Sequence, residues 1–282
     1  MYNKSSGKFT GIAMIGMLVL ASAALGILPS RDARASTSIE TMTDTLAKGL
    51  AIARERKQRH AGWRDMKADM AMTLRNATGK TSSREIRSQS LEIADDGDLS
   101  LAIFDHPLDI KGTSFLTHSH VLEPDEQWLY LPALKRVKRI NAKTRSGPFM
   151  GSEFAYEDMS SFEVEKYDFE FLRDESIGAV ECFVTQSQPR DTHSGYSRMV
   201  SWIDKRDFKV LKVDYYDRRG ELLKTFEASD YTLHEGRFWR AATVKMTNHQ
   251  TGKSTDINWR NFRFGTGLSA SDFNKNSLKR AR

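Results

Sequence analysis

The chain has 282 residues, of which 39% are apolar and 28% are charged, and its formal net charge is +6. These proportions are typical of a globular protein and exclude both a disordered polyelectrolyte and a membrane protein with several spans. Cys182 is the only cysteine, which excludes an internal disulfide framework and a cysteine-rich zinc site.

The N-terminal segment has the pattern of a secretory signal peptide. Lys4 and Lys8 precede an uncharged, mostly apolar run over residues 11–28, and an Ala-Arg-Ala motif ends at Ala35. Small residues at these two positions match the rule for signal peptidase. The run has the lower limit of length for spanning a bilayer, so a transmembrane anchor is the competing interpretation. We favour cleavage near Ala35, which makes residues 1–35 a signal peptide.

The signal peptide would also remove part of the positive charge. It carries four basic residues and one acid, which is half of the net charge of the chain. Proteins that bind nucleic acid need a basic surface that tracks the phosphates, and an exported protein rarely meets such a partner. We therefore expect no nucleic-acid partner.

Residues 38–58 have the spacing of an amphipathic helix. Thr37 and Glu40 form a capping-box pattern. Apolar residues then recur on one helical face, at Ile39, Met42, Leu46, Leu50 and Ala53. The ordinary role of such a helix is packing against a core, and the alternative is a lid over a cavity.

The period then changes to two, which indicates β-strands. In the first strand the side chains of Met66, Met70 and Met72 share one apolar face. The other strand candidates are 82–94, 99–103, 113–118, 126–131, 134–140, 161–172, 178–187, 197–204, 208–217, 221–232, 237–248 and 254–264. Many short strands, few helices and no linker predict one antiparallel sheet that is curled or closed.

Such a sheet must cover one face with a second sheet, a ligand or a helix. Methionine is flexible and recurs on surfaces that accept varied apolar partners. The methionine row of the first strand therefore either lines a cavity or fills gaps in an ordinary core.

The central segment carries the most specific motifs. In the strand 126–131, Trp128 and Tyr130 occupy one face and Leu129 and Leu131 the other, so both faces are apolar. The stretch Trp-Leu-Tyr-Leu-Pro ends at Pro132, where proline stops the strand. A basic Lys-Arg-x-Lys-Arg-Ile stretch and a Phe-Met-Gly-Ser block follow at 135–140 and 149–152.

This order of motifs resembles the LolA-like family of outer-membrane lipoprotein-sorting proteins, in particular the branch associated with exporters of the resistance–nodulation–division (RND) type. The resemblance covers roughly residues 60–265. It implies a mainly β (α+β) fold: an unclosed antiparallel β-barrel, or half-barrel, with helices packed in its concave face. We expect this domain over residues 36–268, followed by a polar, basic and loose tail at 269–282.

The resemblance also implies a function. We expect a periplasmic carrier that holds lipid or lipoprotein acyl chains in an apolar cavity for transfer to the outer membrane, working with an inner-membrane RND-type transporter. The alternative is a non-catalytic periplasmic accessory or sensor subunit of an envelope transporter. We expect the cavity to be lined by Met66, Met70, Met72, Trp128 and Tyr130. Structural roles are expected for the motif residues Gly112, Pro132, Gly151, Ser152, Tyr156 and Asp158, the last two braced on one face of an extended segment.

Six cations without an intervening acid lie between residues 135 and 145. One interpretation makes Lys135, Arg136, Lys138 and Arg139 a docking face for anionic headgroups or a transporter. The other is a solvated strand whose cations pair with acids such as Glu153, Glu157 and Asp158.

The sequence gives little support for an enzyme. His118 and His120 share one strand face, as in the start of a metal site, but a third ligand at a recognisable spacing is missing. Nucleophile-elbow, zinc-protease and P-loop motifs are missing too. Cys182 lies in a strand-like run, which favours a buried inert thiol. We expect no catalytic residue, no metal and no cofactor.

Overall fold

The computed structural model describes residues 31–280, so most of the predicted signal peptide lies outside the described residues. The chain divides into two units, Met1–Glu40 and Thr41–Arg282. Of the first, only a helical stretch from Arg31 is described. Within residues 31–280, each helix is too short or too polar to cross a bilayer.

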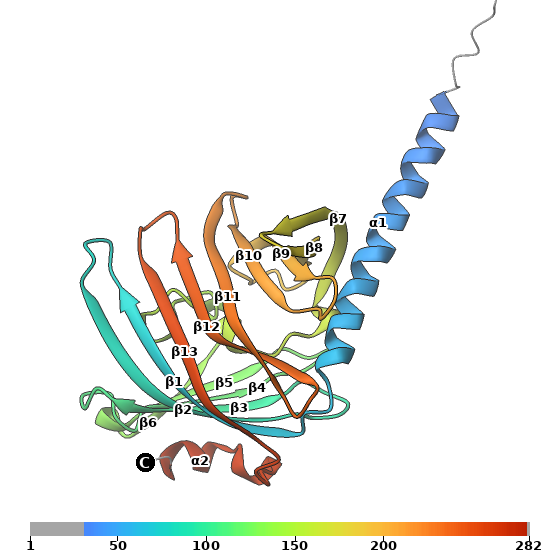
Figure 1. Ribbon diagram of the computed structural model, residues 1–282. Helices are drawn as coiled ribbons and strands as arrows, with labels where there is room; N and C mark the ends of the chain where they lie inside the picture. Colours follow the sequence, from blue (N-terminus) through green and yellow to red (C-terminus); the bar gives the residue numbers. More distant parts are fainter. Residues whose placement is uncertain (1–30, 281–282) are drawn as a thin grey trace, which may run out of the picture. The chain divides into compact units, whose positions relative to one another are not determined.

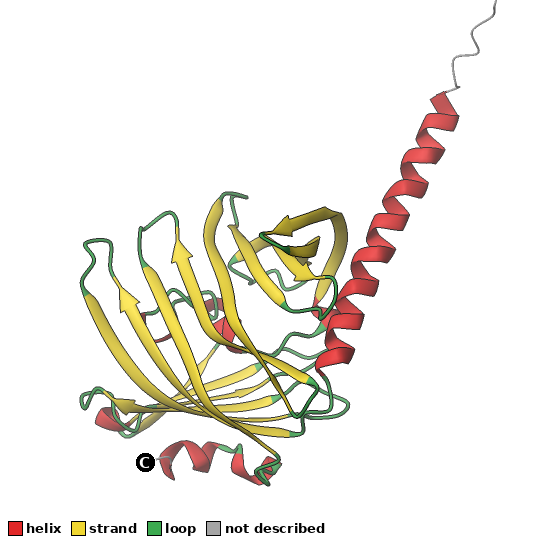
Figure 2. Cartoon of the chain, viewed as in Figure 1, coloured by secondary structure: helices red, strands yellow, loops and turns green. Residues whose placement is uncertain are grey.

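The second unit is built on one antiparallel sheet (Figures 1 and 2). Its strands within the described residues are β1 (Asp65–Arg75), β2 (Thr81–Leu91), β3 (Leu99–His106), β4 (Ser114–His118), β5 (Glu126–Leu131), β6 (Arg136–Ile140), β7 (Tyr167–Ile177), β8 (Val180–Pro189), β9 (Tyr196–Asp204), β10 (Val210–Asp217), β11 (Leu222–His234), β12 (Phe238–Asn248) and β13 (Ser254–Phe264). Their order is β6-β5-β4-β3-β2-β1-β13-β12-β11-β10-β9-β8-β7. Since β6 and β7 are the two ends of this order, the barrel is unclosed, and the predicted fold class is confirmed.

The strands curl around one concave core. Its buried members include Met70 and Met72 from β1, Phe104 from β3 and Met246 from β12. Shifts of register in β1, β7 and β10 bend the sheet, as β-bulges do. The predicted strand 161–172 is wrong in its first part, because β7 begins only at Tyr167.

The segment 141–166, between the two free edges, fills one half of the concave side. It consists of four short 3-10 turns, η2 (Ala142–Thr144), η3 (Phe149–Gly151), η4 (Tyr156–Met159) and η5 (Val164–Lys166). Phe149 is fully buried, and its ring lies 5.1 Å from that of Phe115 and 5.6 Å from that of Tyr156. This segment plugs the hollow at the end where β1–β5 converge.

The long helix α1 (Arg31–His60) begins before the predicted helix 38–58. Its C-terminal half packs against the sheet: Ile52 shares a buried cluster with Ile203 and Phe208, and Ala53 shares another with Phe169. At Gly49 a Cβ would lie 2.7 Å from backbone atoms of β7, so the helix crosses this strand at close range. Met42 and Leu46 are 56% and 44% exposed, so the predicted apolar face packs only in its second half.

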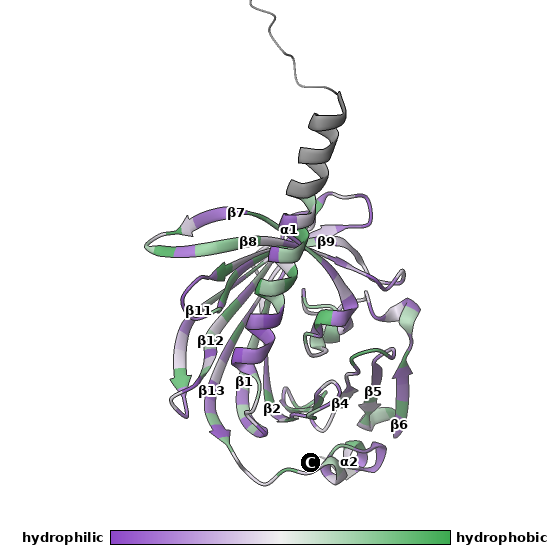
Figure 3. Cartoon of the chain, turned by 90° about the vertical axis from the view of Figure 1, so that its right-hand side faces the viewer, coloured by the Kyte–Doolittle hydropathy of each residue, from purple (hydrophilic) through white to green (hydrophobic). Residues whose placement is uncertain are grey.

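The expectation of a loose tail at 269–282 is wrong for residues 269–280, the part that the structure describes. A 3-10 turn, η6 (Ala270–Asp272), and helix α2 (Lys275–Arg280) lie beneath β4 and β5, outside the curve of the sheet (Figure 3). Phe273 and Leu278 are buried against Leu116 and Trp128. Ser114 Oγ donates a hydrogen bond of 2.8 Å to the Leu278 carbonyl. Two apolar side chains in a polar stretch were enough to dock it.

Candidate functional site

The other half of the concave side holds a pocket of about 730 Å³. Its volume falls in the range of about 300–1,000 Å³ that is typical of ligand sites. Strands β8–β11 form its floor, α1 and the 157–167 segment form walls, and the β4–β5 loop forms part of the rim. The floor side chains include Thr185, Ser187, Tyr196, Met199, Ser201, Ile203, Val210, Val213, Tyr215 and Phe226.

Aromatic rings give the pocket much of its apolar surface. The rings of Tyr196 and Tyr215 lie 4.8 Å apart, and Tyr215 and Phe226 also touch the concave core. Burial raises the pKa of Tyr167, Tyr196 and Tyr215 above the ordinary tyrosine range. These phenols therefore remain neutral, as an apolar ligand requires.

A polar brace closes the pocket at η4. Asp158 accepts hydrogen bonds from the Tyr196 hydroxyl at 2.8 Å and from Lys224 Nζ at 2.7 Å. Glu157 accepts from Ser194 Oγ at 2.8 Å and from the Gly195 amide at 2.9 Å. These four bonds fix the 3-10 turn to β9, to the two residues before it and to β11, and burial raises the pKa of Glu157.

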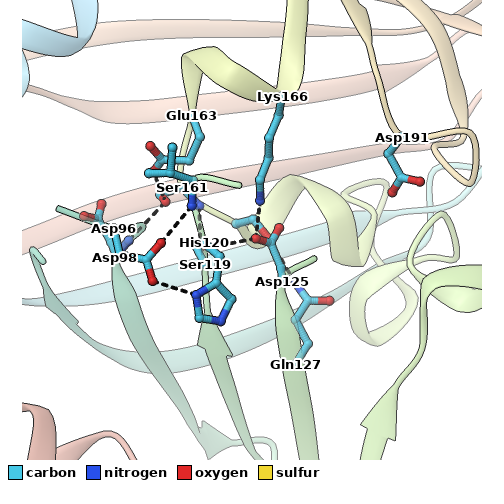
Figure 4. Close-up of polar contacts among 12 residues, drawn as sticks. Asp96, Asp98, Ser119, His120, Asp125, Gln127, Ser161, Glu163, Lys166 and Asp191 are labelled. Atoms are coloured by element: carbon cyan, nitrogen blue, oxygen red, sulfur yellow. Dashed lines mark hydrogen bonds and ion pairs between the residues drawn. The ribbon is translucent and has the colours of Figure 1, made fainter. Parts of the chain in front are cut away.

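A second network joins the rim to α1, and Figure 4 shows the part of it that lies between residues 119 and 166. Lys57 of α1 forms an ion pair with the buried Glu163 at 2.9 Å. Ser161 Oγ donates to Glu163 at 2.6 Å, and the Ser161 amide donates to Ser119 Oγ. Asp125 accepts from Lys166. The segment that borders the pocket is thus held on one side by α1 and on the other by the ends of β4 and β5.

The structure does not bring the five expected cavity residues together. Met70 and Met72 lie in the concave core beside the Phe149 plug, and Met66 is half-buried near one end of β1. Trp128 and Tyr130 lie on the opposite face of the sheet, in the cluster that α2 covers. None of the five is among the described residues that line the pocket. The expected common lining is therefore corrected.

The physical reason for this error is the two-residue period of a strand. Both faces of β5 are apolar, because one meets the concave core through Leu129 and the other meets α2 through Trp128. The alternation separates the two faces but does not tell which one is concave. The docked tail, which the composition of 269–282 concealed, is what covers Trp128.

The basic cluster consists of Lys135, directly before β6, and three cations of β6, at a free edge of the sheet. Lys135, Arg136, Lys138 and Arg139 are exposed, and Arg139 pairs with Glu126 at 2.9 Å. The acids expected to pair with these cations have other partners: Glu153 accepts a hydrogen bond from Asn248, and Asp158 accepts one from Lys224. Cations along an edge strand also prevent pairing with a further strand. These exposed cations are accessible to a partner, and they protect the edge from pairing with a further strand whether or not a partner binds.

The motif residues form turns and short hydrogen-bonded segments. Gly112 and Gly151 have φ of +80° and +81°, which favour glycine. Pro132 starts a 3-10 turn, η1 (Pro132–Leu134), directly after β5. Ser152 is buried and its hydroxyl donates to the Phe149 carbonyl at 2.7 Å. Tyr156 belongs to a 3-10 turn with Asp158, so the expected extended backbone there is wrong.

The two histidines face different partners. His118 Nε2 lies 2.7 Å from the Phe273 carbonyl oxygen, and His120 Nδ1 lies 2.7 Å from Asp96 Oδ2. Among the described residues, there is no group of three or more His, Cys, Asp and Glu side chains that could hold a metal ion. Cys182 is fully buried, and burial raises the pKa of its thiol, which suppresses the reactive thiolate.

The chain is similar to proteins of known structure. A family model described only as an uncharacterized protein matches residues 96–280. No curated protein matches the chain. Among solved structures, a candidate outer membrane lipoprotein-sorting protein domain from Vibrio parahaemolyticus is 55% identical, with a TM-score of 0.82, over 83% of this chain and 99% of that one. The chain belongs to the LolA-like lipoprotein-sorting family.

Two further structures extend the likeness. A DUF1329 family protein from Desulfovibrio piger is 27% identical, with a TM-score of 0.79, over 83% of this chain and 99% of that one. A LolA superfamily protein from Nitrosomonas europaea is 17% identical, with a TM-score of 0.65, over 81% and 98%. At this identity the last likeness concerns the fold alone, and it agrees with the unclosed barrel of this LolA-like protein.

Sequence reasoning missed most of the pocket of this LolA-like protein. Tyr196, Tyr215 and Phe226 lie in strands that were predicted with nearly correct bounds, but which strands surround a cavity depends on the curl of the sheet. Arg56 lies in the predicted helix near its C-terminal end, where cations ordinarily suit the helix dipole. Its position in the pocket wall became visible only when α1 was placed against the sheet.

Proposed function

We propose that this LolA-like protein is a carrier that holds the acyl chains of a lipid or lipoprotein in its concave pocket for transfer to the outer membrane. The observation that supports this most is the pocket itself: about 730 Å³, floored by aromatic and aliphatic side chains of an unclosed barrel. The name of the relative from Vibrio parahaemolyticus, a candidate lipoprotein-sorting domain, supports the same class of cargo.

Holding such a cargo requires no covalent chemistry. Removing an acyl chain from water contributes about 0.8 kcal/mol per buried CH₂ group, so an apolar pocket is enough. Release requires that the empty and filled states differ little in free energy. Helix α1 is suited to this balance, because Ala53 and Arg56 line the pocket while Gly49 lies directly against the backbone of β7. A shift of this helix would change the volume that the cargo can occupy.

We place the mature protein in the periplasm after cleavage near Ala35, and we assign it no catalytic residue and no cofactor. The partner we propose is an inner-membrane transporter of the RND type. The exposed cations at the β6 edge, Lys135, Arg136, Lys138 and Arg139, are suited to dock on it or on anionic lipid headgroups.

The proposal is tested by native mass spectrometry on the protein purified from the periplasm without detergent. We expect a lipid or acylated peptide in about one-to-one ratio, and its mass would name the cargo. A protein that is empty and also takes up no added lipid would overturn the carrier function and favour an accessory subunit of a transporter.

A pocket-filling variant tests the location. Ser201 lies on the pocket floor, so a Ser201→Trp side chain should occupy the space of the cargo and weaken lipid binding by about tenfold or more, which corresponds to about 1.4 kcal/mol. Lipid binding is measured by displacement of the neutral probe N-phenyl-1-naphthylamine. The matched control is Arg198→Trp on the same strand, where the guanidinium stacks on Tyr216 outside the pocket. Equal lipid binding by both folded variants would exclude this pocket.

A further inference from the structure

Arg56 differs from the other cations around the pocket. Its guanidinium lies 4.1 Å from the ring centroid of Phe162. Within the described part of the chain, no hydrogen bond or ion pair joins this guanidinium to an oxygen atom. A guanidinium carries five N–H donors. Arg56 therefore presents unsatisfied donors in the wall of a pocket that is otherwise suited to apolar chains.

Two carboxylates of the pocket, Asp158 and Glu157, are already engaged. Asp158 binds Lys224 and Tyr196, and Glu157 binds Ser194 and the Gly195 amide. The remaining cations have oxygen partners as well: Lys166 and Arg145 pair with Asp125, and Arg190 pairs with Asp168. The positive charge of Arg56 is thus left without a counter-ion among the described side chains.

The surroundings of Arg56 make this charge unfavourable when the pocket is empty. The neighbouring groups are neutral phenols, those of Tyr167, Tyr215 and Tyr231, and burial lowers the pKa of the guanidinium. Arginine nevertheless stays charged at neutral pH. A half-buried cation without an ion-pair partner costs free energy, which an incoming anion recovers through strong, charge-assisted hydrogen bonds.

We infer that the pocket selects amphiphiles that carry an anionic oxygen acid, a carboxylate or a phosphate, at the end of an acyl chain, and that Arg56 binds this group inside the pocket. The inference rests on the proposed function and narrows its cargo. An acyl group in a neutral lipid or alcohol fills the apolar floor equally well but leaves the guanidinium unpaired. Acidic lipids are therefore preferred over neutral ones of the same chain length.

The test compares three probes with the same chain: dodecanoate, dodecyl phosphate and 1-dodecanol. Each displaces N-phenyl-1-naphthylamine from the protein purified without detergent and delipidated. We expect the two anions to bind about 10- to 100-fold more tightly than the alcohol, as for charge-assisted hydrogen bonds. The ratio between dodecanoate and dodecyl phosphate tells a free fatty acid from a phospholipid headgroup as the natural source of the anion.

Substitutions at Arg56 test whether this residue causes the preference for anionic probes. Arg56→Met should remove the preference, so that the anions bind no more tightly than the alcohol, and Arg56→Lys should keep part of it. The control Arg54→Met removes an exposed cation two residues away on the same helix and should leave the preference intact. The preference should also persist at high salt, whereas attraction by the exposed β6 cations would be screened.

Each outcome has a distinct meaning. If the wild-type protein binds all three probes equally, or if Arg56→Met keeps the preference for anions, the role of Arg56 is overturned while the carrier function stands. If none of the probes binds, the carrier function and the inference fall together.

Discussion

The carboxyl group of Asp98 makes the stability of the protein depend on pH. The backbone amide of Asp98 donates to Ser161 Oγ and its carbonyl accepts from the Ser119 amide (Figure 4), and Lys57 pairs with the neighbouring Glu163. Burial raises the pKa of Asp98 to about 6, and the neighbouring Glu163 adds to the rise, while Lys57 opposes it. Between the ordinary carboxyl pKa and about 6, the folded state holds a proton that the unfolded state has lost. The contribution of Asp98 to stability therefore falls as pH rises through this window.

Asp98→Asn should remove this loss. We expect the free energy of unfolding of the variant, relative to wild type, to increase by about 1–3 kcal/mol between pH 4 and pH 7. His60 acts in the opposite sense, because burial lowers its pKa to about 4 and its contribution rises between about pH 4 and 6.5. The difference between variant and wild type in urea unfolding isolates Asp98. A difference that stays constant over this range would contradict the assignment.

At the scale of the element, helix α2 acts as a clamp on the outer face of β4 and β5. Phe273 and Leu278 are buried, and the carbonyls of both residues are bonded from the strands, by His118 and Ser114. Lys275 Nζ lies 4.6 Å from the ring centroid of Trp128. A chain cut at 268, the boundary expected from composition, would uncover this tryptophan.

Leu278→Ala should weaken the clamp. Removal of a fully buried leucine side chain costs about 2–5 kcal/mol, and here the loss is limited to the free energy that holds the tail in place. We expect trypsin to cleave at Lys275 and Lys279 much faster in the variant than in wild type. Lys279→Met, at an exposed position, is the control and should not accelerate cleavage at Lys275. A tail that is equally resistant in Leu278→Ala would show that the contacts of Phe273 hold it alone.

The strands were predictable and their facing was not. Alternation located most strands to within a few residues, as for 254–264 and 126–131, because the pattern is local. The side of the sheet on which Trp128 is buried depended on α2, a helix of six residues that buries Leu278. The plugging of one half of the concave side depended on Phe149, which lies in a segment without regular periodicity. Such contacts join distant residues, and no local pattern encodes them.

At the scale of the whole molecule, the two free edges of the sheet differ. Helix α1 crosses β7 at Gly49, and Lys48 lies over the ring of Phe171 at 3.4 Å. Strand β6 has no such cover in the described structure and carries exposed cations instead. The protein therefore offers one charged edge on which an anionic surface can dock.

Neutralising this edge tests the docking role. A variant with Lys135, Arg136, Lys138 and Arg139 all changed to Gln should bind vesicles of anionic phospholipid more weakly than wild type, by about 1 kcal/mol for each lost charge near the surface. Its binding should also depend less on salt. Co-sedimentation measures both, with vesicles of neutral phospholipid as the control. Binding that ignores these changes would leave the cations with the protection of the edge as their role.

The pairing of β1 with β13 has a consequence for folding. Every other neighbouring pair in the sheet joins strands that follow each other in sequence, whereas this pair joins the first strand to the last, as Met66 to Phe264. The molecule consists of two meanders, β1–β6 and β7–β13, joined at one seam. A chain that folds from its N-terminus completes the first meander long before β13 exists. Until then β1 keeps an open edge beside Met70 and Met72, which makes the unfinished half-sheet the species most exposed to aggregation.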